Sequence, residues 1–284
     1  MTPAAFEPEP SDPERSEPGP TDPGQQAGPV LDPQGPPLPT RQIMSQWWRD
    51  ITFLHWPVDP ALLAPLLPEG VRPDVFDGSA WVGLIPFRMV DAGIGAGRPV
   101  PWLGTFAETN VRVYSVDDRG RHGVTFLSLE AQRLLVVLGA RLGFNVPYEW
   151  ASMRVRDHTG PAGEGEAGGR VLTYTTRRFT RARVAGVGRP RSRVTVRVGE
   201  PLAEPSPLDL FLTARFGLHT RVAGRTLWVP NTHGPWPLRS AELLELDDEL
   251  VAAAGLGWFA RATPPATVLF SDGVRTTFGF PQRL

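Results

Sequence analysis

The stretch Glu108-Thr109-Asn110-Val111-Arg112-Val113-Tyr114 alternates polar and apolar residues with a period of two. Side chains of a β-strand point alternately to its two faces. One face of this strand therefore carries Glu108, Asn110, Arg112 and Tyr114, and the valines lie on the other. Such a row fits two interpretations. It lines a pocket, where the carboxylate works as acid or base and the guanidinium binds an anion. Alternatively it faces solvent and forms cross-strand ion pairs, each worth under about 1 kcal/mol.

Short strand-like segments continue on both sides of this stretch, rich in Val, Phe, Trp, Thr and Tyr and bounded by Gly, Pro or Asp. The expected strands are Trp47–Leu54, Ser79–Met89, Phe106–Ser115, Gly123–Leu129, Ala151–Asp157, Arg170–Thr176, Val194–Val198, Leu227–Pro230 and Thr267–Phe270. The expected helices are Asp59–Leu67, Glu130–Leu142, Leu208–Phe216 and Asp247–Ala254. Many short strands with few helices predict a mainly β fold with minor α content, either a barrel or a sandwich.

The first 40 residues differ from the rest of the chain. They contain twelve prolines, seven acidic residues and one arginine. A segment of this composition buries too little apolar surface to offset the entropy lost on ordering. We therefore expect residues 1–40 to form a disordered acidic tail, whose removal leaves the melting temperature unchanged, and residues 41–284 to form one folded domain. The tail has a net charge of −6 and the chain −1, which leaves about +5 on the domain.

Composition excludes several classes of function. The chain has no cysteine and no lysine, so disulfides, thiolate nucleophiles and lysine Schiff bases are all excluded. Neither a long apolar segment nor a secretory signal pattern is present, so we expect a cytoplasmic location without membrane contact. The small net charge gives no indication of nucleic-acid binding.

Histidine and glycine patterns add little. No pair of the five histidines has metal-ligand spacing, so we predict no metal and no cofactor. His55 and His233 lie among aromatic residues, where each is either a structural histidine or a group with a shifted pKa. Gly93–Gly97 lacks the lysine of a phosphate-binding loop and is interpreted as an ordinary loop.

Residues 177–197 contain eight arginines and one aromatic residue, Phe179. Single-strand nucleic-acid recognition needs stacking aromatic residues between the cations. We therefore interpret this segment as a solvated hairpin, with a surface for an anionic ligand or an acidic partner as the alternative.

Several motifs together resemble the YqjF-like family of uncharacterised proteins, which is related to acetoacetate decarboxylase. They are Phe53-Leu54-His55-Trp56, Leu67-Pro68-Glu69-Gly70, Phe76-Asp77-Gly78-Ser79-Ala80-Trp81-Val82-Gly83, Pro86-Phe87-Arg88-Met89, Glu108 to Tyr114, Phe126 to Ala131, Pro147-Tyr148, His233 to Pro237 and Ser271 to Val274. The resemblance covers nearly all of the chain after Gln46. It implies an acetoacetate decarboxylase-like closed antiparallel β-barrel with a few short peripheral helices. Because such barrels enclose ligand cavities, it also favours the pocket interpretation of the Glu108 row.

The resemblance fails at the catalytic lysines. Acetoacetate decarboxylases form an imine through a lysine pair, in a segment that is similar to residues 140–149 here. The matching positions are Tyr148 and Glu149, and neither forms an imine. The residue that resembles the active-site acid of the decarboxylases is Glu108.

Three functions stay open. The first is an enzyme acting on a small carbonyl or carboxylate compound, with Glu108 and Tyr148 as the candidate catalytic residues. The candidate ligand-binding residues are Arg112, Asn110, Tyr114, His55, His233 and Trp81. The second is a non-catalytic module that holds a small molecule in the barrel, with the tail recruiting a partner. The third is an interaction protein with a filled barrel, which requires the Glu108 row to face outward. The sequence does not indicate the oligomeric state.

Overall fold

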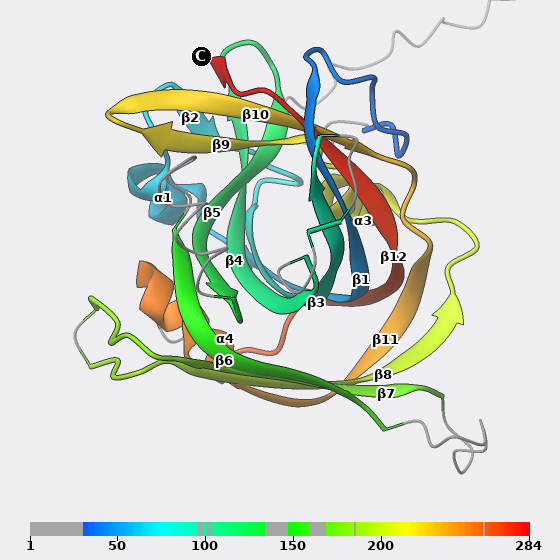
Figure 1. Ribbon diagram of the computed structural model, residues 1–284. Coiled ribbons are helices and arrows are strands. Elements are labelled where there is room, and N and C mark those ends of the chain that lie inside the picture. The colour runs from blue at the N-terminus through cyan, green and yellow to red at the C-terminus, as the bar shows by residue number, and fades with distance from the viewer. Residues whose placement is uncertain are drawn as a thin grey trace, which may run out of the picture.

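The computed structural model describes residues 31–95, 99–100, 104–133, 147–158, 169–184, 186–257 and 259–284. Strands dominate these ranges (Figure 1). They are β1 (Gln42–Val58), β2 (Val71–Pro73), β3 (Ala80–Ile94), β4 (Phe106–Asp117), β5 (His122–Ala131), β6 (Tyr148–Asp157), β7 (Val171–Arg178), β8 (Arg191–Pro201), β9 (Gly217–Val222), β10 (Arg225–His233), β11 (Leu238–Asp248), β12 (Thr267–Gly279) and β13 (Gln282–Arg283). The helical segments are α1 (Pro60–Leu63), η1 (Ala64–Leu66), α3 (Pro207–Thr213), the π-helical η2 (Ala252–Leu256) and α4 (Phe259–Ala262). The chain is mainly β, as predicted.

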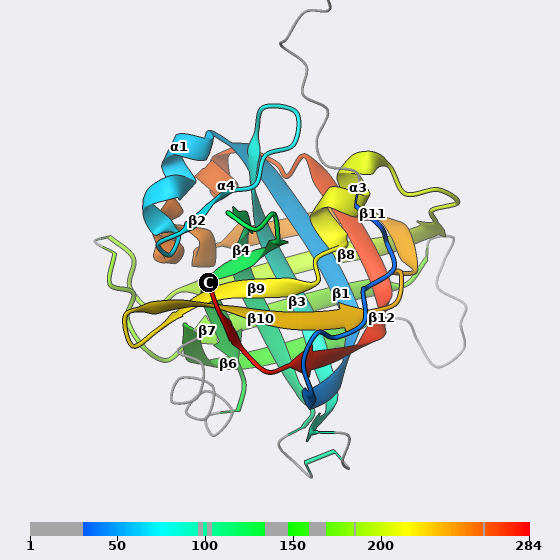
Figure 2. The same ribbon diagram turned by 90° about the horizontal axis from the view of Figure 1, so that it is seen from above.

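The strand pairings form a ring-like sheet in two parts that share a wall. The shared wall consists of β12, β1, β3, β4 and β5. On one side β6, β7, β8 and β11 connect β5 back to β12, and we call this circuit the first ring. On the other side β9 and β10 make the connection, forming the second ring. Figures 1 and 2 show β9 and β10 at one end of the molecule and β6, β7 and β8 at the opposite end.

The sheet is not wholly antiparallel, in contrast to the expectation from the resemblance. β5 pairs in parallel with β6 and with β9. The contact with β6 connects the shared wall to the rest of the first ring, and the contact with β9 connects it to the rest of the second ring. Both contacts are short. Val124 with Leu218 is the only residue pair in the contact with β9 among the described residues.

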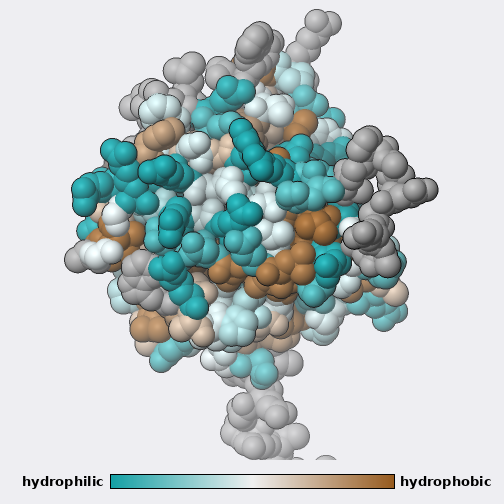
Figure 3. All heavy atoms as spheres, turned by 90° about the horizontal axis from the view of Figure 1, so that it is seen from below, coloured by the Kyte–Doolittle hydropathy of each residue, from teal (hydrophilic) through white to brown (hydrophobic). Residues whose placement is uncertain are grey.

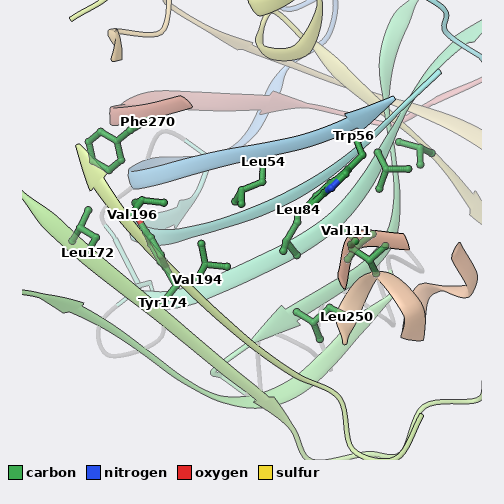
Figure 4. Close-up of a cluster of buried hydrophobic side chains, with 14 of the residues drawn as sticks. Leu54, Trp56, Leu84, Val111, Leu172, Tyr174, Val194, Val196, Leu250 and Phe270 are labelled. Atoms are coloured by element: carbon green, nitrogen blue, oxygen red, sulfur yellow. The ribbon is translucent and has the colours of Figure 1, made fainter. Parts of the chain in front are cut away.

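The two rings have different interiors, because wall residues alternate between them. The first ring encloses a large apolar core, part of which Figure 4 shows. It includes Leu54, Leu84 and Val111 from the wall and Val194 from β8. The second ring encloses the opposite faces of the same strands, with Phe53 and Phe87 among the apolar residues.

All nine predicted strands are present, most of them longer than predicted. The strands β2, β9, β11 and β13 were not predicted. β11 has the sequence LRSAELLELDD, whose leucines, glutamates and alanine are typical of helices. Tertiary pairing with β8 makes it a strand.

The helix predictions had mixed outcomes. The predicted start at Asp59 is confirmed, because its side chain accepts a hydrogen bond from Ala61 N at 2.8 Å and Pro60 follows. α3 overlaps the predicted 208–216 helix, but it begins at Pro207 and ends at Thr213. The 130–142 prediction is wrong at Glu130 and Ala131, which belong to β5, and residues 134–142 lie outside the described ranges. The 247–254 prediction is wrong at Asp247 and Asp248, which end β11.

Part of the expected tail contacts the folded body. Residues 31–40 are described, and Gly35 is buried. Gly35 N donates to His233 O at 3.0 Å, and Thr40 Oγ1 donates to Phe280 O at 3.3 Å. Residues 1–30 lie outside the described ranges. No helix among the described residues has the length and apolar character that a membrane crossing requires.

Candidate functional site

The polar row of β4 faces the interior of the second ring. Glu108, Asn110, Arg112 and Tyr114 are 3, 4, 8 and 0% exposed. The register of β3 and β4 sets Glu108 opposite Phe87, whose side chain belongs to the core of the second ring. The row therefore does not form the solvent-facing ion pairs of the alternative interpretation.

Glu108 and Tyr148 form a buried pair. Tyr148 begins β6, and the parallel pairing of β5 with β6 brings it beside β4. Its hydroxyl donates to Glu108 Oε2 at 3.0 Å. Burial raises the pKa of Glu108 to about 8, while the Tyr148 hydrogen bond lowers it and the charge of Glu130 raises it further. Glu108 is therefore a neutral carboxyl group at pH 7.

A hydrogen-bond network surrounds the Tyr114 hydroxyl. His55 Nε2 lies 2.6 Å from it, and Arg112 donates to it through Nε at 3.2 Å and Nη2 at 3.0 Å. Leu212 O, at the end of α3, lies 2.9 Å from the same hydroxyl. Burial and the nearby guanidinium of Arg112 hold the pKa of His55 well below its ordinary value, so this imidazole is neutral at pH 7. Three predicted residues thus belong to one network, and most of the donors of Arg112 are already used in it.

Aromatic side chains line the rest of this interior. Trp48 stacks on Trp236 at a centroid distance of 5.9 Å, and His233 packs against both. His233 Nδ1 lies 2.7 Å from Gly234 O, and burial lowers the pKa of its imidazole. Trp81 is buried in the same interior, beside Tyr114.

Several polar atoms in this interior have no hydrogen-bond partner in the described part of the chain. They include Asn110 Oδ1, Trp48 Nε1 and Trp81 Nε1. A buried polar atom without a partner costs about 1–3 kcal/mol. Such atoms are positioned to bind polar groups of a small molecule.

A hollow of about 390 Å³ lies outside this interior and is lined in part by Trp236. Its lining is mainly apolar and includes Leu202, Leu210 and Leu238, with Pro33 from the N-terminal segment. Because Trp236 lies between the hollow and Trp48, it separates the outside from the second ring.

The predicted site residues do not form a single hydrogen-bonded group. Within the described ranges no hydrogen bond connects the Glu108–Tyr148 pair with the Tyr114 network. Glu149 is set opposite Glu130 and accepts a hydrogen bond from Thr180 at 2.7 Å, away from Glu108. Trp48 and Arg215 were not among the predicted site residues. Arg215 Cζ lies 4.9 Å from the centroid of the Tyr114 ring. The sequence pattern around it indicated only a helix over residues 208–216, so it was not identified as a site residue.

A Ser-His-Asp grouping lies between β4 and β9 and is buried. His219 Nδ1 is 2.9 Å from Ser115 Oγ, and His219 Nε2 is 3.5 Å from Asp117 Oδ2. All three are at most 1% exposed, and burial lowers the pKa of His219 to about 4. No substrate reaches this serine, so we assign the grouping to stability. In the described part of the chain no three His, Asp or Glu residues are grouped to hold a metal ion.

Comparison with known proteins identifies the family. Residues 45–275 match the DUF2071 family, described as an uncharacterized conserved protein. This chain belongs to the DUF2071 family. The uncharacterized protein YqjF of Bacillus subtilis (strain 168) is 33% identical over 202 residues, which are 70% of this chain and 76% of YqjF. The expected membership of a YqjF-like family is confirmed.

Solved structures show an acetoacetate decarboxylase-like fold for this DUF2071 protein. The enduracididine biosynthesis enzyme MppR matches with a TM-score of 0.55 and 14% identity, covering 86% of this chain and 88% of MppR. The acetoacetate decarboxylase of Legionella pneumophila matches with a TM-score of 0.53 and 14% identity, covering 93% and 92% of the two chains. An acetoacetate decarboxylase-like enzyme of Sphingomonas wittichii RW1 matches with a TM-score of 0.53 and 15% identity, covering 86% and 93%. At these identities the likeness concerns the fold alone.

Proposed function

We propose that the chain is an enzyme that transfers protons on a small carbonyl or carboxylate compound held in the second ring, without forming an imine. The observation that carries this proposal is the buried Glu108–Tyr148 pair, with a carboxyl pKa of about 8. A carboxylic acid whose pKa lies near neutral pH is suited to both donating and accepting a proton. Part of the proposal is that the second ring closes around the bound molecule as a barrel.

The proposed reaction is the interconversion of a keto compound and its enol. The neutral carboxyl of Glu108 gives its proton to the carbonyl oxygen, and the resulting carboxylate takes a proton from the neighbouring carbon. The number of protons on Glu108 is then restored, and the substrate has changed from keto to enol. The Tyr148 hydroxyl stabilises the carboxylate between the two transfers because it donates a hydrogen bond to Oε2.

Other interior groups support binding in this proposal. Asn110 Oδ1 and the indole N–H groups of Trp48 and Trp81 have no partner among the described residues, and they offer one acceptor and two donors. Arg112 supplies positive charge to an anionic substrate group, with Nη1 as the nitrogen outside its hydrogen bonds to Tyr114 and Leu212. The substrate enters past Trp236. Structures of MppR carry pyruvate or a pyruvate condensation product, which suggests small keto acids as the first compounds to test.

The test is hydrogen exchange on pyruvate and acetoacetate in D₂O, followed by proton NMR. The expected result is enzyme-dependent exchange of hydrogens next to the carbonyl, reduced at least tenfold in Glu108→Gln. The matched control is Glu149→Gln, since this neighbouring glutamate faces away from the site and should retain the activity. Exchange that is equal in wild type and Glu108→Gln would refute the proposed role of Glu108.

The alternative is a non-catalytic module that binds a small molecule. The use of most Arg112 donors in the Tyr114 network favours it, because a rigid, satisfied network suits retention more than chemistry. Ligand binding raises apparent stability by mass action. A thermal-shift screen of keto acids, carboxylates, aldehydes and apolar ligands would support this alternative if stable binding occurs without hydrogen exchange.

A further inference from the structure

The outer face of β6 and β7 carries a row of side chains that neither ring interior uses. β6 alternates buried Ala151 and Met153 with exposed Ser152, Arg154 and Arg156. This face lies at the end of the molecule opposite β9 and β10. Figure 3 shows the molecule from this side, and hydrophilic side chains cover much of the surface. The row is therefore a solvent-facing surface, separate from the proposed active site.

Strand register brings four guanidinium groups of this face around one hollow. Ser152 pairs with Arg177, Arg154 with Thr175, and Thr175 with Arg193 of β8. The hollow has a volume of about 520 Å³. Its lining includes all four arginines, Arg154, Arg156, Arg177 and Arg193, together with the hydroxyl-bearing residues Ser152, Thr173 and Thr175.

Among the described residues, most of this positive charge has no carboxylate partner. Arg154, Arg156 and Arg177 have no ion-pair partner in the described part of the chain, whereas Arg193 Nε lies 2.7 Å from Glu245 Oε2. Arginines elsewhere on the same sheet are paired, such as Arg197 with Glu242. Three unpaired like charges around one hollow create a local field that favours an anion. Guanidinium groups bind phosphate oxygens through paired hydrogen bonds.

An exposed aromatic pair lies at one end of this outer face of β6 and β7. Trp150 and Phe179 are 38% and 41% exposed, and their ring centroids are 4.2 Å apart. Phe179 N donates to Trp150 O at 3.0 Å, which holds the two residues together. Trp150 and Phe179 lie two residues along the chain from Ser152 and Arg177, a cross-strand pair that lines the hollow. Solvent-exposed aromatic rings beside arginines suit stacking of a nucleobase next to its phosphates.

We propose that this outer face binds a nucleoside triphosphate, with the phosphates among Arg154, Arg156 and Arg177 and the base on the Trp150–Phe179 pair. The site is independent of the proposed function of Glu108. The arginine-rich segment 177–197 alone gave no such indication, because the aromatic partner and two of the arginines come from β6. The pairing of β6 with β7 brings the two halves of the surface together.

Isothermal titration of the full chain at low salt tests the proposal with three probes: ATP, inorganic tripolyphosphate and adenosine. ATP should bind most tightly, tripolyphosphate more weakly, and adenosine least. The double variant Arg154→Ala/Arg177→Ala should weaken both phosphate probes about tenfold or more, because each loses charged hydrogen bonds. Trp150→Ala should weaken ATP about fivefold or more while leaving tripolyphosphate unchanged, since only ATP carries a base.

The matched control is Arg191→Ala/Arg197→Ala, which removes two exposed but ion-paired arginines of β8. This variant should retain wild-type affinity for ATP. An equal loss in both double variants would overturn the proposal, because the binding would then depend only on net charge. The proposal would also be overturned if ATP showed no saturable binding, whether or not a single-stranded oligonucleotide bound tightly.

Discussion

Glu108 and Glu130 are buried glutamates on neighbouring strands that face opposite sides of the shared wall. Glu130 faces the first ring, where Arg178 and Ser128 both contact Oε1. Glu108 faces the second ring, where its one hydrogen-bond partner in the described part of the chain is the Tyr148 hydroxyl. Burial raises the pKa of both, and among the described residues Glu130 has a cation, Arg178, that counters the effect, whereas Glu108 has none.

The comparison separates a structural charge from a reactive one. Glu130 has an arginine and a hydroxyl at Oε1, and this ion pair links β5 to β7, while its Oε2 has no hydrogen-bond partner among the described residues. A buried carboxyl with a phenol alone holds its proton at neutral pH and has an oxygen free for further contact.

The largest expected effect comes from removing the cation of the first ring. Arg178→Met leaves Glu130 buried without its partner, which should lower the free energy of unfolding by about 3–5 kcal/mol. Urea denaturation at pH 7 measures this change. Arg177→Ala, one residue away and exposed, should change stability by about 0.5 kcal/mol or less. A loss under about 1 kcal/mol for Arg178→Met would contradict the assigned ion pair.

The second prediction concerns pH and the second ring. The pKa of Glu108 is raised from 4.5 in the unfolded chain to about 8 in the fold. The folded state therefore binds more protons than the unfolded state between these values, and stability falls as pH rises from about 4.5 to about 8. The shift corresponds to up to about 5 kcal/mol. Glu108→Gln has no carboxyl at this position and lacks this pH-dependent contribution. Its free energy of unfolding should therefore match that of wild type near pH 4.5 and exceed it at pH 9.

The pH dependence is tested by comparing the stability of wild type and Glu108→Gln. Urea denaturation of both proteins at pH 5, 7 and 9 supplies the comparison, with Glu149→Gln as control. If Glu108→Gln is less stable than wild type at pH 9, Glu108 is ionised and satisfied in the fold, like a member of an ion pair.

The third prediction concerns the N-terminal segment, which contacts the second ring through Gly35 and His233. Deletion of residues 1–30 should leave the melting temperature unchanged, since their composition offers little apolar surface. Deletion of residues 1–40 should cost about 1–2 kcal/mol, because two hydrogen bonds to the body are lost. Calorimetry of both truncations checks this, and equal melting temperatures would contradict a structural role for residues 31–40.

The smallest expected effect is that of Tyr148→Phe. The Tyr148 hydrogen bond lowers the pKa of Glu108, so its loss should raise that pKa above 8. We expect a shift of about one pKa unit or less, equivalent to about 1.4 kcal/mol or less. Carboxyl NMR titration of the variant measures it. A downward shift would show that the hydroxyl does not stabilise the carboxylate.

The sequence predicted one part of this comparison and missed the other. The period-two pattern of residues 108–114 placed four polar side chains on one face, because alternation is a local property of strands. It did not reveal that this face is buried, since that depends on β9 and β10 covering it. β9 was missed because the predicted helix 208–216 runs up to its start.

The contacts between strands distant in the sequence could not be predicted. Tyr148 was identified only through its match to a decarboxylase lysine, and its position against Glu108 results from the parallel pairing of β5 with β6. The charge state of Glu108 likewise depends on which charged groups pack beside it, and this is not set by spacing in the sequence. The Trp150–Phe179 pair needs the same kind of long-range register.

The most direct test of the central claim is a ¹³C NMR titration of the glutamate side-chain carboxyls, with Glu108 assigned by comparison with Glu108→Gln. We predict one carboxyl that titrates with a pKa near 8 and is missing from the spectrum of Glu108→Gln. A Glu108 resonance that titrates near 4.5 would mean that the carboxyl is ionised at neutral pH, and it would contradict the proposed role of Glu108 as the proton-transfer group.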